Sequence, residues 1–160
     1  IFGFIYEDLL KIPFNDLSRG PKKQAPMVFE KQKIAINICY EDVFGNEIIR
    51  QLPSANILLN MSNDAWYGES IAAEQHLQIS QARAIETGRV MMRATNTGVT
   101  AFINEKGKVI NQMPQFLTGE LTQDIQGFKG STPFIKYGHF PIIILSFLIF
   151  IFTLFRSKFK

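Results

Sequence analysis

The chain of 160 residues contains few of the side chains from which many sites are built, with a single cysteine and only two histidines. One cysteine cannot form an internal disulfide bond, so cysteine usage does not reveal the redox compartment. No set of histidine, cysteine and acidic residues has the spacing of a metal site, and the sequence contains no glycine-rich phosphate loop. We therefore expect no metal and no diffusible cofactor.

Charge is also sparse, since 17 Lys and Arg against 14 Asp and Glu give a formal net charge of +3. The basic residues are scattered, which excludes a nucleic-acid groove. A hydrophobic content of 46% excludes general disorder, and the length suits one domain with a sizeable core. The chain begins at Ile1 with neither a methionine nor a signal-peptide pattern, so we expect a piece of a longer protein.

The most apolar segment lies near the C-terminus and reads FPIIILSFLIFIFTLF over residues 140–155, without any charge. A helix that spans a bilayer needs about 20 mostly apolar residues, with about 17 as the lower limit. Residues 137–139, placed at the interface, extend the run into this range. The sequence therefore predicts a transmembrane helix over residues 137–156, and the alternative is a buried helix or an aggregating tail.

Basic residues follow the apolar run at once, in Arg156, Lys158 and Lys160. By the positive-inside tendency, the tail at 157–160 is predicted to be cytoplasmic. The domain formed by residues 1–136 then lies on the outer side of the membrane.

The rest of the chain alternates short apolar runs with segments of helical spacing, punctuated by proline and glycine. The patterns predict strands at 33–39 and 55–62, helices at 46–52 and 72–94, two strands within 98–113, and a strand at 120–125, after a loop-like stretch at 1–30. This order of strands and helices predicts a layered α/β domain.

The cysteine, Cys39, ends the first predicted strand and is followed by Tyr40, Glu41 and Asp42. A lone cysteine is most often a small buried hydrophobe. At a sharp turn from strand to helix, however, a side chain is lifted out of the sheet, and the following backbone N–H groups can face a developing oxyanion. The two acids disfavour the thiolate, so a nucleophilic Cys39 needs a cation from elsewhere and a carboxylate to hold the proton.

A polar stretch, residues 62–64, follows the second strand, so it is expected to meet Cys39 at one edge of the sheet. Trp66 and Tyr67 come next and are interpreted either as core aromatics or as the lining of a pocket.

The long helix carries His76, which is either the base of a Cys–His thiol hydrolase or a histidine on a packing or solvent face. Four charged residues with helical spacing are interpreted as salt bridges on the helix surface. They are Arg83, Glu86, Arg89 and Arg93. Asn96 and Thr97, beyond the helix, either turn the chain or line the site.

Four segments carry a family resemblance, and they read ICYEDVFG, LLNMSNDAWYGES, AEQHLQISQARAIETGR and MRATNTGVTAFINEKGKV. They resemble the second half of a nitrilase-superfamily domain, above all that of the bacterial apolipoprotein N-acyltransferase family. The resemblance runs from about Leu17 to the end. Cys-Tyr-Glu alone is shared by many nitrilase-like amidases, whereas SNDAWYG together with RATNTG and a terminal apolar segment is more specific.

The resemblance implies an αββα sandwich, of which residues 1–136 form the C-terminal half, and a Glu–Lys–Cys triad. Cys39 matches the nucleophile, Tyr40 the residue whose backbone N–H helps form the oxyanion hole, and Glu41 the supporting acid. The residues that match the loop beside the substrate pocket are Asn63, Asp64 and Trp66. The triad lysine then supplies the cation that Cys39 needs, and the triad glutamate the base.

The implied activity is N-acylation of the N-terminal diacylglyceryl cysteine of apolipoproteins, with a phospholipid as acyl donor and a thioester on Cys39. The implied location is the bacterial inner membrane, with several spans in the full-length protein and the catalytic domain on the periplasmic side. The family's glutamate and lysine lie upstream of the cysteine, in a context that residues 1–38 lack. We therefore expect this chain to be catalytically incomplete on its own. The alternatives are a membrane-tethered nitrilase-type amidase and a non-functional fragment or interaction module.

Overall fold

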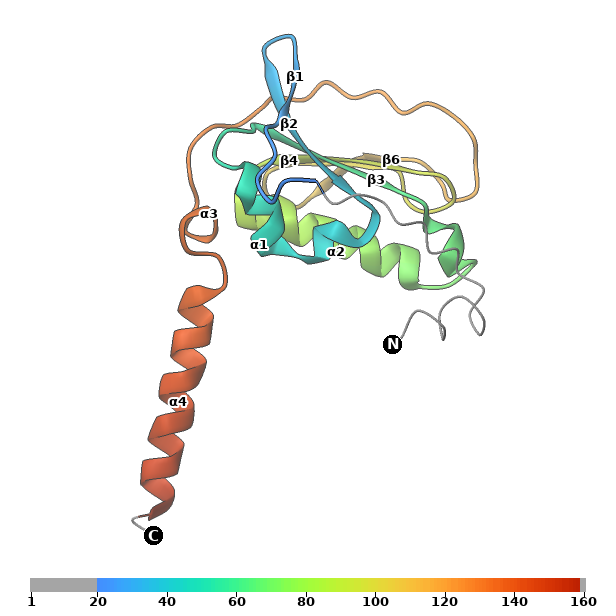
Figure 1. The fold of residues 1–160 in the computed structure, drawn as a ribbon. Coiled ribbons are helices and arrows are strands. Elements are labelled where there is room, and N and C mark those ends of the chain that lie inside the picture. Colours follow the sequence, from blue (N-terminus) through green and yellow to red (C-terminus); the bar gives the residue numbers. More distant parts are fainter. Residues whose placement is uncertain (1–19, 159–160) are drawn as a thin grey trace.

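A computed structural model describes residues 20–158 and contains one mixed six-stranded sheet (Figure 1). The strands are β1 (Met27–Phe29), β2 (Gln32–Ile38), β3 (Ile57–Ser62), β4 (Val90–Thr95), β5 (Ala101–Ile103) and β6 (Val109–Gln112). They lie side by side in chain order. The central strands β2, β3 and β4 are parallel, whereas β1 pairs with β2, and β5 and β6 follow β4, in antiparallel fashion.

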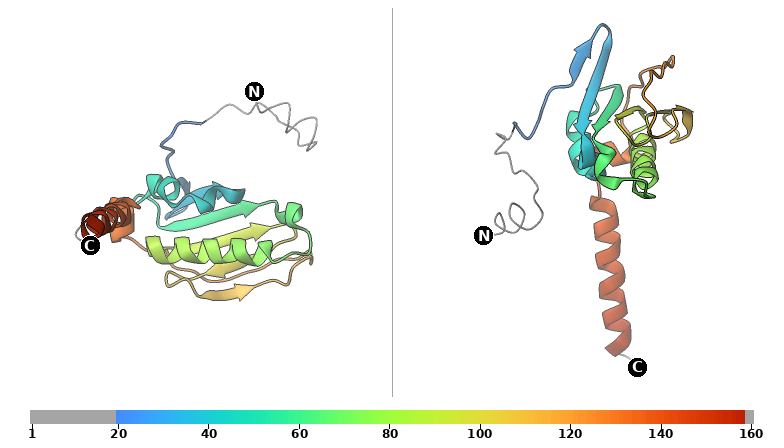
Figure 2. Two further views of the ribbon diagram at one scale, coloured as in Figure 1. Left: turned by 90° about the horizontal axis from the view of Figure 1, so that it is seen from below. Right: turned by 90° about the vertical axis from the view of Figure 1, so that its right-hand side faces the viewer.

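The parallel strands are connected through helices, as their geometry requires. A 3-10 turn η2 (Cys39–Val43), helix α1 (Gly45–Ile48) and a second 3-10 turn η3 (Ile49–Gln51) connect β2 to β3, and a 3-10 turn η4 (Asp64–Tyr67) and helix α2 (Ala72–Thr87) connect β3 to β4. Both helices lie on the same face of the sheet (Figures 1 and 2). The core forms between this face and the helices, around Leu58 and Met91 of the sheet and Leu77 and Ala84 of α2.

Two neighbouring rows of side chains cross the carboxyl ends of β2, β3 and β4. The register aligns Asn37, Asn60 and Arg93 as one row, called here the polar row. It aligns Ile38, Met61 and Ala94 as the next row, called the apolar row. Because successive side chains of a strand point to opposite faces, the polar row faces α2 and the apolar row faces away from it.

Strands predicted at 33–39 and 55–62 correspond to β2 and β3, and the two strands predicted within 98–113 correspond to β5 and β6. The helix predicted over 72–94 is wrong beyond Thr87. Gly88 takes a left-handed conformation with φ of 60°, and its N–H group bonds to the carbonyls of Ala84 and Ile85, which ends the helix. The chain then enters β4, which pairs with both neighbouring strands.

Two other predictions change. The loop-like stretch at 1–30 contains β1 at its end, while residues 1–19 lie outside the described part of the chain. Residues 120–125 form no strand and belong to the irregular segment between β6 and α3 (Pro133–Tyr137).

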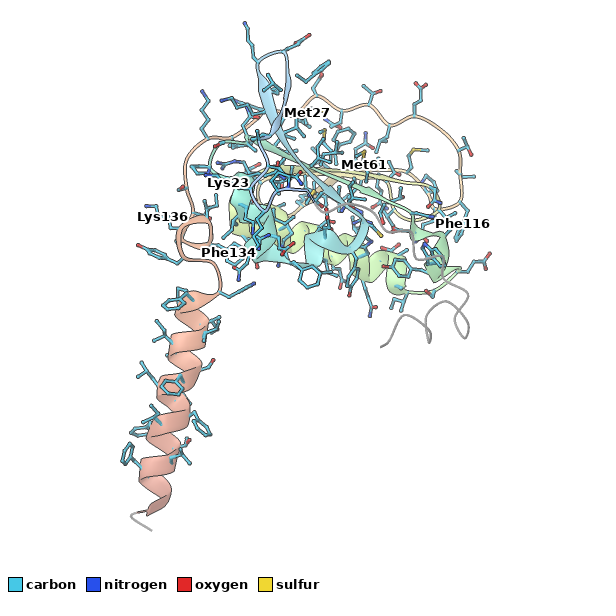
Figure 3. The ribbon with its side chains drawn as sticks, viewed as in Figure 1. Lys23, Met27, Met61, Phe116, Phe134 and Lys136 are labelled. Carbon is cyan, nitrogen blue, oxygen red and sulfur yellow. The ribbon has the colours of Figure 1, made fainter. Side chains whose placement is uncertain are left out.

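The C-terminal part of the described chain is helix α4 (Phe140–Lys158), which points away from the sheet. Most of its apolar side chains project outward from the helix (Figure 3), and Phe140, Phe147 and Phe152 are each more than 60% exposed. Within residues 20–158, no helix combines the length and the hydropathy that crossing a membrane requires. The predicted span at 137–156, and with it the division into 1–136, 137–156 and 157–160, stays a prediction.

Candidate active site

Cys39 occupies the turn that sequence reasoning assigned to it, directly after β2 and at the first position of η2. Its φ of 54° lies in the left-handed region, which a residue with a side chain adopts only when the surroundings enforce it. The side chain is partly exposed. The strand-to-helix turn therefore lifts the sulfur out of the sheet, as a nucleophile requires.

Hydrogen bonds made by Asn60 and by Glu41 stabilise this turn. Asn60, fully buried in β3, donates from Nδ2 to the carbonyl oxygen of Cys39 at 2.8 Å and to Asn37 Oδ1 at 2.7 Å. The Glu41 carboxylate accepts the backbone N–H of Ile38 at 2.7 Å. Glu41 thus closes the turn around Cys39, a contact that is compatible with its predicted supporting role.

His76 lies behind the turn, buried on α2 between two carboxylates. Its Nε2 is 3.0 Å from Asp42 Oδ1, and its Nδ1 is 3.1 Å from Asp64 Oδ1. Both ring nitrogens are therefore occupied, and neither is available to take a proton from Cys39. This arrangement argues against the Cys–His hydrolase alternative.

Arg93 closes this arrangement from β4. Its guanidinium contacts Asp42 Oδ2 at 3.5 Å through Nη1 and Asp64 Oδ2 at 3.1 Å through Nη2. The four side chains alternate in sign around a closed loop, called here the charge ring, which consists of Asp42, His76, Asp64 and Arg93. None is more than 2% exposed. Two serines add hydrogen bonds at 2.5 Å, from Ser80 Oγ to Asp42 and from Ser62 Oγ to Asp64.

The ring sets the protonation of its members. Burial lowers the pKa of His76, but the hydrogen bonds to Asp42 and Asp64 outweigh it and raise the pKa to about 9. Burial raises the pKa of Asp64, yet hydrogen bonds from His76 and Ser62 and the charge of Arg93 bring it below its ordinary value. At neutral pH His76 is therefore protonated and Asp64 is ionised.

The loops after β3 and β4 are joined beside the ring. The Asn96 amide donates to Asn63 Oδ1 at 2.7 Å, and its oxygen accepts the backbone N–H of Asp64 at 3.0 Å. Gly98 lies so close to the Asp64 carboxyl that a β-carbon there would overlap it. Trp66 extends from this loop and is 70% exposed.

Tyr67, at the end of η4, is an aromatic neighbour of Cys39. Burial, and then the negative charges of Cys39 and Asp64, raise its pKa. Its ring packs edge-on against the ring of His76, with centroids 6.1 Å apart. Tyr67 thus interacts both with His76 of the charge ring and with Cys39.

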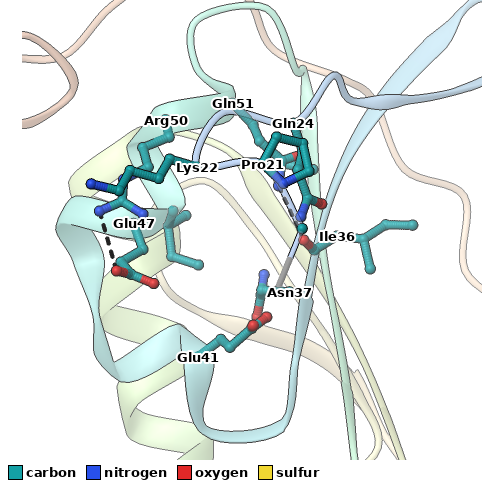
Figure 4. A pocket seen from close by; sticks show the side chains of 12 residues that line it. Pro21, Lys22, Gln24, Ile36, Asn37, Glu41, Glu47, Arg50 and Gln51 are labelled. Carbon is teal, nitrogen blue, oxygen red and sulfur yellow. Dashed lines mark hydrogen bonds and ion pairs between the residues drawn. The ribbon is translucent and has the colours of Figure 1, made fainter. Parts of the chain in front are cut away.

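A cavity of about 590 Å³ lies between β2, the turn after it and the segment that contains Lys22 (Figure 4). Asn37, Glu41 and Gln51 line it together with Lys22, and Cys39 is not part of its wall. Within residues 20–158, the cavity wall reaches the turn that carries Cys39 through Glu41.

The predicted site residues thus fall into two groups. Cys39, Tyr40, Asn63 and Trp66 lie at the surface of the strand-end edge, whereas Asp64 is buried and its carboxylate is used within the charge ring. The salt bridges predicted on one helix face are confirmed only for Arg83 and Glu86, at 3.0 Å. Arg89 and Arg93 lie outside α2, so that part of the interpretation was wrong.

Sequence reasoning missed Asp42, Asn60 and Ser80, and it assigned Arg93 to a surface. One signal was present, because KIAINI, ILLNMS and VMMRAT each carry a polar residue at the same depth of an apolar run. These three residues are the polar row.

The strand-to-helix turn that carries Cys39, the parallel strands and the helices on one face define a nitrilase-like α/β domain. A solved Saccharomyces cerevisiae member of branch 10 of the nitrilase superfamily shares this fold, with a TM-score of 0.53 at 16% identity over 62% of this chain and 39% of that one. The sequence profile of the carbon-nitrogen hydrolase family matches residues 8–132. The chain belongs to the carbon-nitrogen hydrolase family.

Within this family, the chain is similar to curated proteins named apolipoprotein N-acyltransferase. It is 55% identical to the one from Nitrosomonas europaea over 145 residues, which cover 91% of this chain and 29% of that protein. It is 43% identical to the one from Ralstonia nicotianae over 162 residues, or 98% and 31% of the two chains. The chain thus spans less than a third of the length of these relatives.

Proposed function

We propose that this chain carries the nucleophile of a membrane acyltransferase that N-acylates the N-terminal diacylglyceryl cysteine of apolipoproteins. The observation that carries the proposal is the position of Cys39, a partly exposed cysteine held at a positive φ after a parallel strand. It stands in a chain that is 55% identical to a curated apolipoprotein N-acyltransferase.

The reaction takes place in two steps. The Cys39 thiolate attacks the carbonyl carbon of a phospholipid ester, the C–O bond breaks, and a lysophospholipid leaves with a proton. The α-amine of the diacylglyceryl cysteine then attacks the thioester, an amide forms, and the Cys39 sulfur is released. A carboxylate base, a glutamate by the resemblance, takes the thiol proton and later the amine proton.

Other site residues have roles in both steps. The Tyr40 backbone N–H, with the lysine that the resemblance implies, stabilises the oxyanion of each tetrahedral intermediate. Glu41 fixes the turn by accepting the Ile38 N–H. Asn63, Asp64 and Trp66 shape the loop beside the acyl chain. The exposed indole of Trp66 is its apolar contact surface, and the buried Asp64 holds the loop through His76 and Arg93.

The membrane is the natural location for this chemistry, because donor and acceptor are both lipids. We propose that α4, with the residues that flank it, enters the bilayer of the inner membrane and holds the domain at its periplasmic side. The exposed apolar side chains of α4 and the basic residues after Phe155 support this arrangement.

The test is intact-protein mass spectrometry of the complete gene product in detergent, incubated with phospholipid and no acceptor. We expect an acyl-sized mass increase on Cys39 and its loss when a diacylglyceryl-cysteine peptide is added. The matched control is Cys39→Ser, which keeps the size of the side chain but supplies a far weaker nucleophile. Hydrolysis of small amides without any acyl adduct would overturn the proposal in favour of a tethered amidase.

A further inference from the structure

The charge ring connects three segments that surround the nucleophile. Asp42 belongs to η2, three residues after Cys39, and Asp64 begins η4, the turn that carries Trp66. Arg93 lies in β4, next to the end that leads to Asn96. His76 joins the first two segments from α2 by hydrogen bonds of 3.0 and 3.1 Å.

The ring is also the support beneath a strained residue. Cys39 holds a φ of 54°, a strained conformation that persists only where the surroundings enforce it. Asn60 fixes the start of the turn through the Cys39 carbonyl, and Asp42 fixes its interior through His76, Ser80 and Arg93. The turn therefore has two buried anchors.

We propose that the charge ring is a positioning device for Cys39, and that His76 acts in it as a clamp that bridges Asp42 and Asp64 and not as a base. This inference rests on the proposed function for its substrate readout. The groups that face His76 are Asp42 and Tyr40 from η2, Asp64 and Tyr67 from η4, and Arg93 from β4. The ring fixes where the sulfur lies relative to the ester carbonyl, and it makes no contact with the substrate.

A neutral residue at 76 has two effects. It leaves one surplus negative charge buried, which destabilises the fold, and it breaks the bridge that positions η2 relative to η4. His76→Gln tests both effects together. The double variant Asp64→Asn with His76→Gln removes one charge of each sign, so the remaining Asp42 and Arg93 balance each other. Charge balance is thereby restored, whereas the imidazolium bridge between η2 and η4 stays broken.

The experiment uses the complete gene product and measures the rate of Cys39 acylation across phospholipid concentrations, well below each variant's thermal midpoint. For His76→Gln we expect the maximal rate to fall about 10- to 100-fold, as misplacement of a reacting group predicts, with the half-saturating phospholipid concentration unchanged. For the double variant we expect the thermal midpoint to recover while the rate stays low. His139→Gln makes the same chemical change outside the ring and is expected to react like the wild type.

Alkylation of Cys39 by iodoacetamide, followed at the peptide level, is measured in parallel and needs no acyl donor. Suppose that the wild type is not acylated by phospholipid while His76→Gln still changes the alkylation rate of Cys39 relative to the wild type. In that case the proposed function fails and the positioning role stands. Recovery of the wild-type rate in the double variant would overturn the positioning role, because charge balance alone would then suffice. An unchanged rate in His76→Gln would overturn it as well.

Discussion

The polar and apolar rows at the carboxyl ends of β2, β3 and β4 reverse the usual distribution of polarity. The polar row is at most 3% exposed, whereas Ile38 and Met61 of the apolar row are 59% and 40% exposed. The rows are one residue apart along each strand, so the same backbone presents both. The inward row is polar because the turn that carries Cys39 is anchored through it, by hydrogen bonds and ion pairs that only buried polar groups provide.

The comparison teaches that fully paired charges can replace apolar packing at one end of a core. Ordinary apolar packing, with Leu58 and Met91, resumes two residues away on the same face. The charges at this end are tolerated because Arg93 and His76 pair with Asp42 and Asp64, since an unpaired buried charge is costly. Changes in the polar row are therefore expected to cost much more than changes in the apolar row.

The largest effect is expected for Arg93→Met, which keeps the length of the side chain but leaves two buried carboxylates opposite His76 alone. We expect a loss of about 3–5 kcal/mol in the free energy of unfolding, measured by denaturant unfolding of the purified protein followed by circular dichroism. Ala94→Ser, one residue along on the other face, is the control and is expected to change it by less than about 0.5 kcal/mol. A loss below about 1 kcal/mol for Arg93→Met would mean that the ring is not needed for folding.

Raising the pH should weaken the charge ring without any mutation, because His76 then loses its proton. The folded-state pKa of His76 is about 9, above its ordinary value of 6.5, so its contribution is fully present below pH 6.5 and is lost as the pH rises through 9. The difference corresponds to about 3 kcal/mol of unfolding free energy, measured by denaturant titrations between pH 6 and 10. His76→Gln should flatten this dependence. An equally steep decline in that variant would assign it to other groups.

An intermediate effect is expected for Asn60→Leu. The substitution removes the donor to the Cys39 carbonyl and to Asn37 Oδ1, so two acceptors lose their partner. We expect a loss of about 1–3 kcal/mol in the free energy of unfolding and a slower alkylation of Cys39 by iodoacetamide. Met61→Gln, the neighbouring change on the opposite face, should leave both quantities unaltered. Equal effects of the two substitutions would remove the distinction between the rows.

The smallest effect is expected for Ile38→Thr in the apolar row. Threonine keeps the β-branched shape that suits a strand, and the side chain it replaces is 59% exposed. We expect a change of less than about 0.5 kcal/mol in the free energy of unfolding. A loss above about 1.5 kcal/mol in the complete gene product would show that another part of the protein covers this row.

Much of the fold could be predicted from local pattern. KIAINI and ILLNMS are short apolar runs between polar and proline-containing segments, so β2 and β3 were predicted, and the position of Cys39 at a strand end followed from them. The end of α2 was missed because MMRA continues the helical spacing after Gly88. Only the left-handed conformation of Gly88 and the pairing of β4 with β3 and β5 decide the boundary.

The charge ring could not be predicted in this way. Arg93 and Asp42 are 51 residues apart in the chain, and His76 and Asp42 are 34 apart, so their meeting depends on strand register and on the packing of α2. Sequence reasoning identified the residues that matched a family motif, which lie mostly at the surface of the site. The side chains that hold them in place match no motif and are visible only in three dimensions.

The closed geometry of the charge ring also bears on Asp42, the second of the two acids that follow Cys39. An isolated Asp42 would place a monopole near the sulfur, and its potential would decay slowly through protein of low dielectric constant. Two positive and two negative charges that alternate around a loop form a quadrupole, whose potential falls off far more steeply with distance. The Asp42 carboxyl therefore does not stand alone beside Cys39, because it is paired with His76 and Arg93.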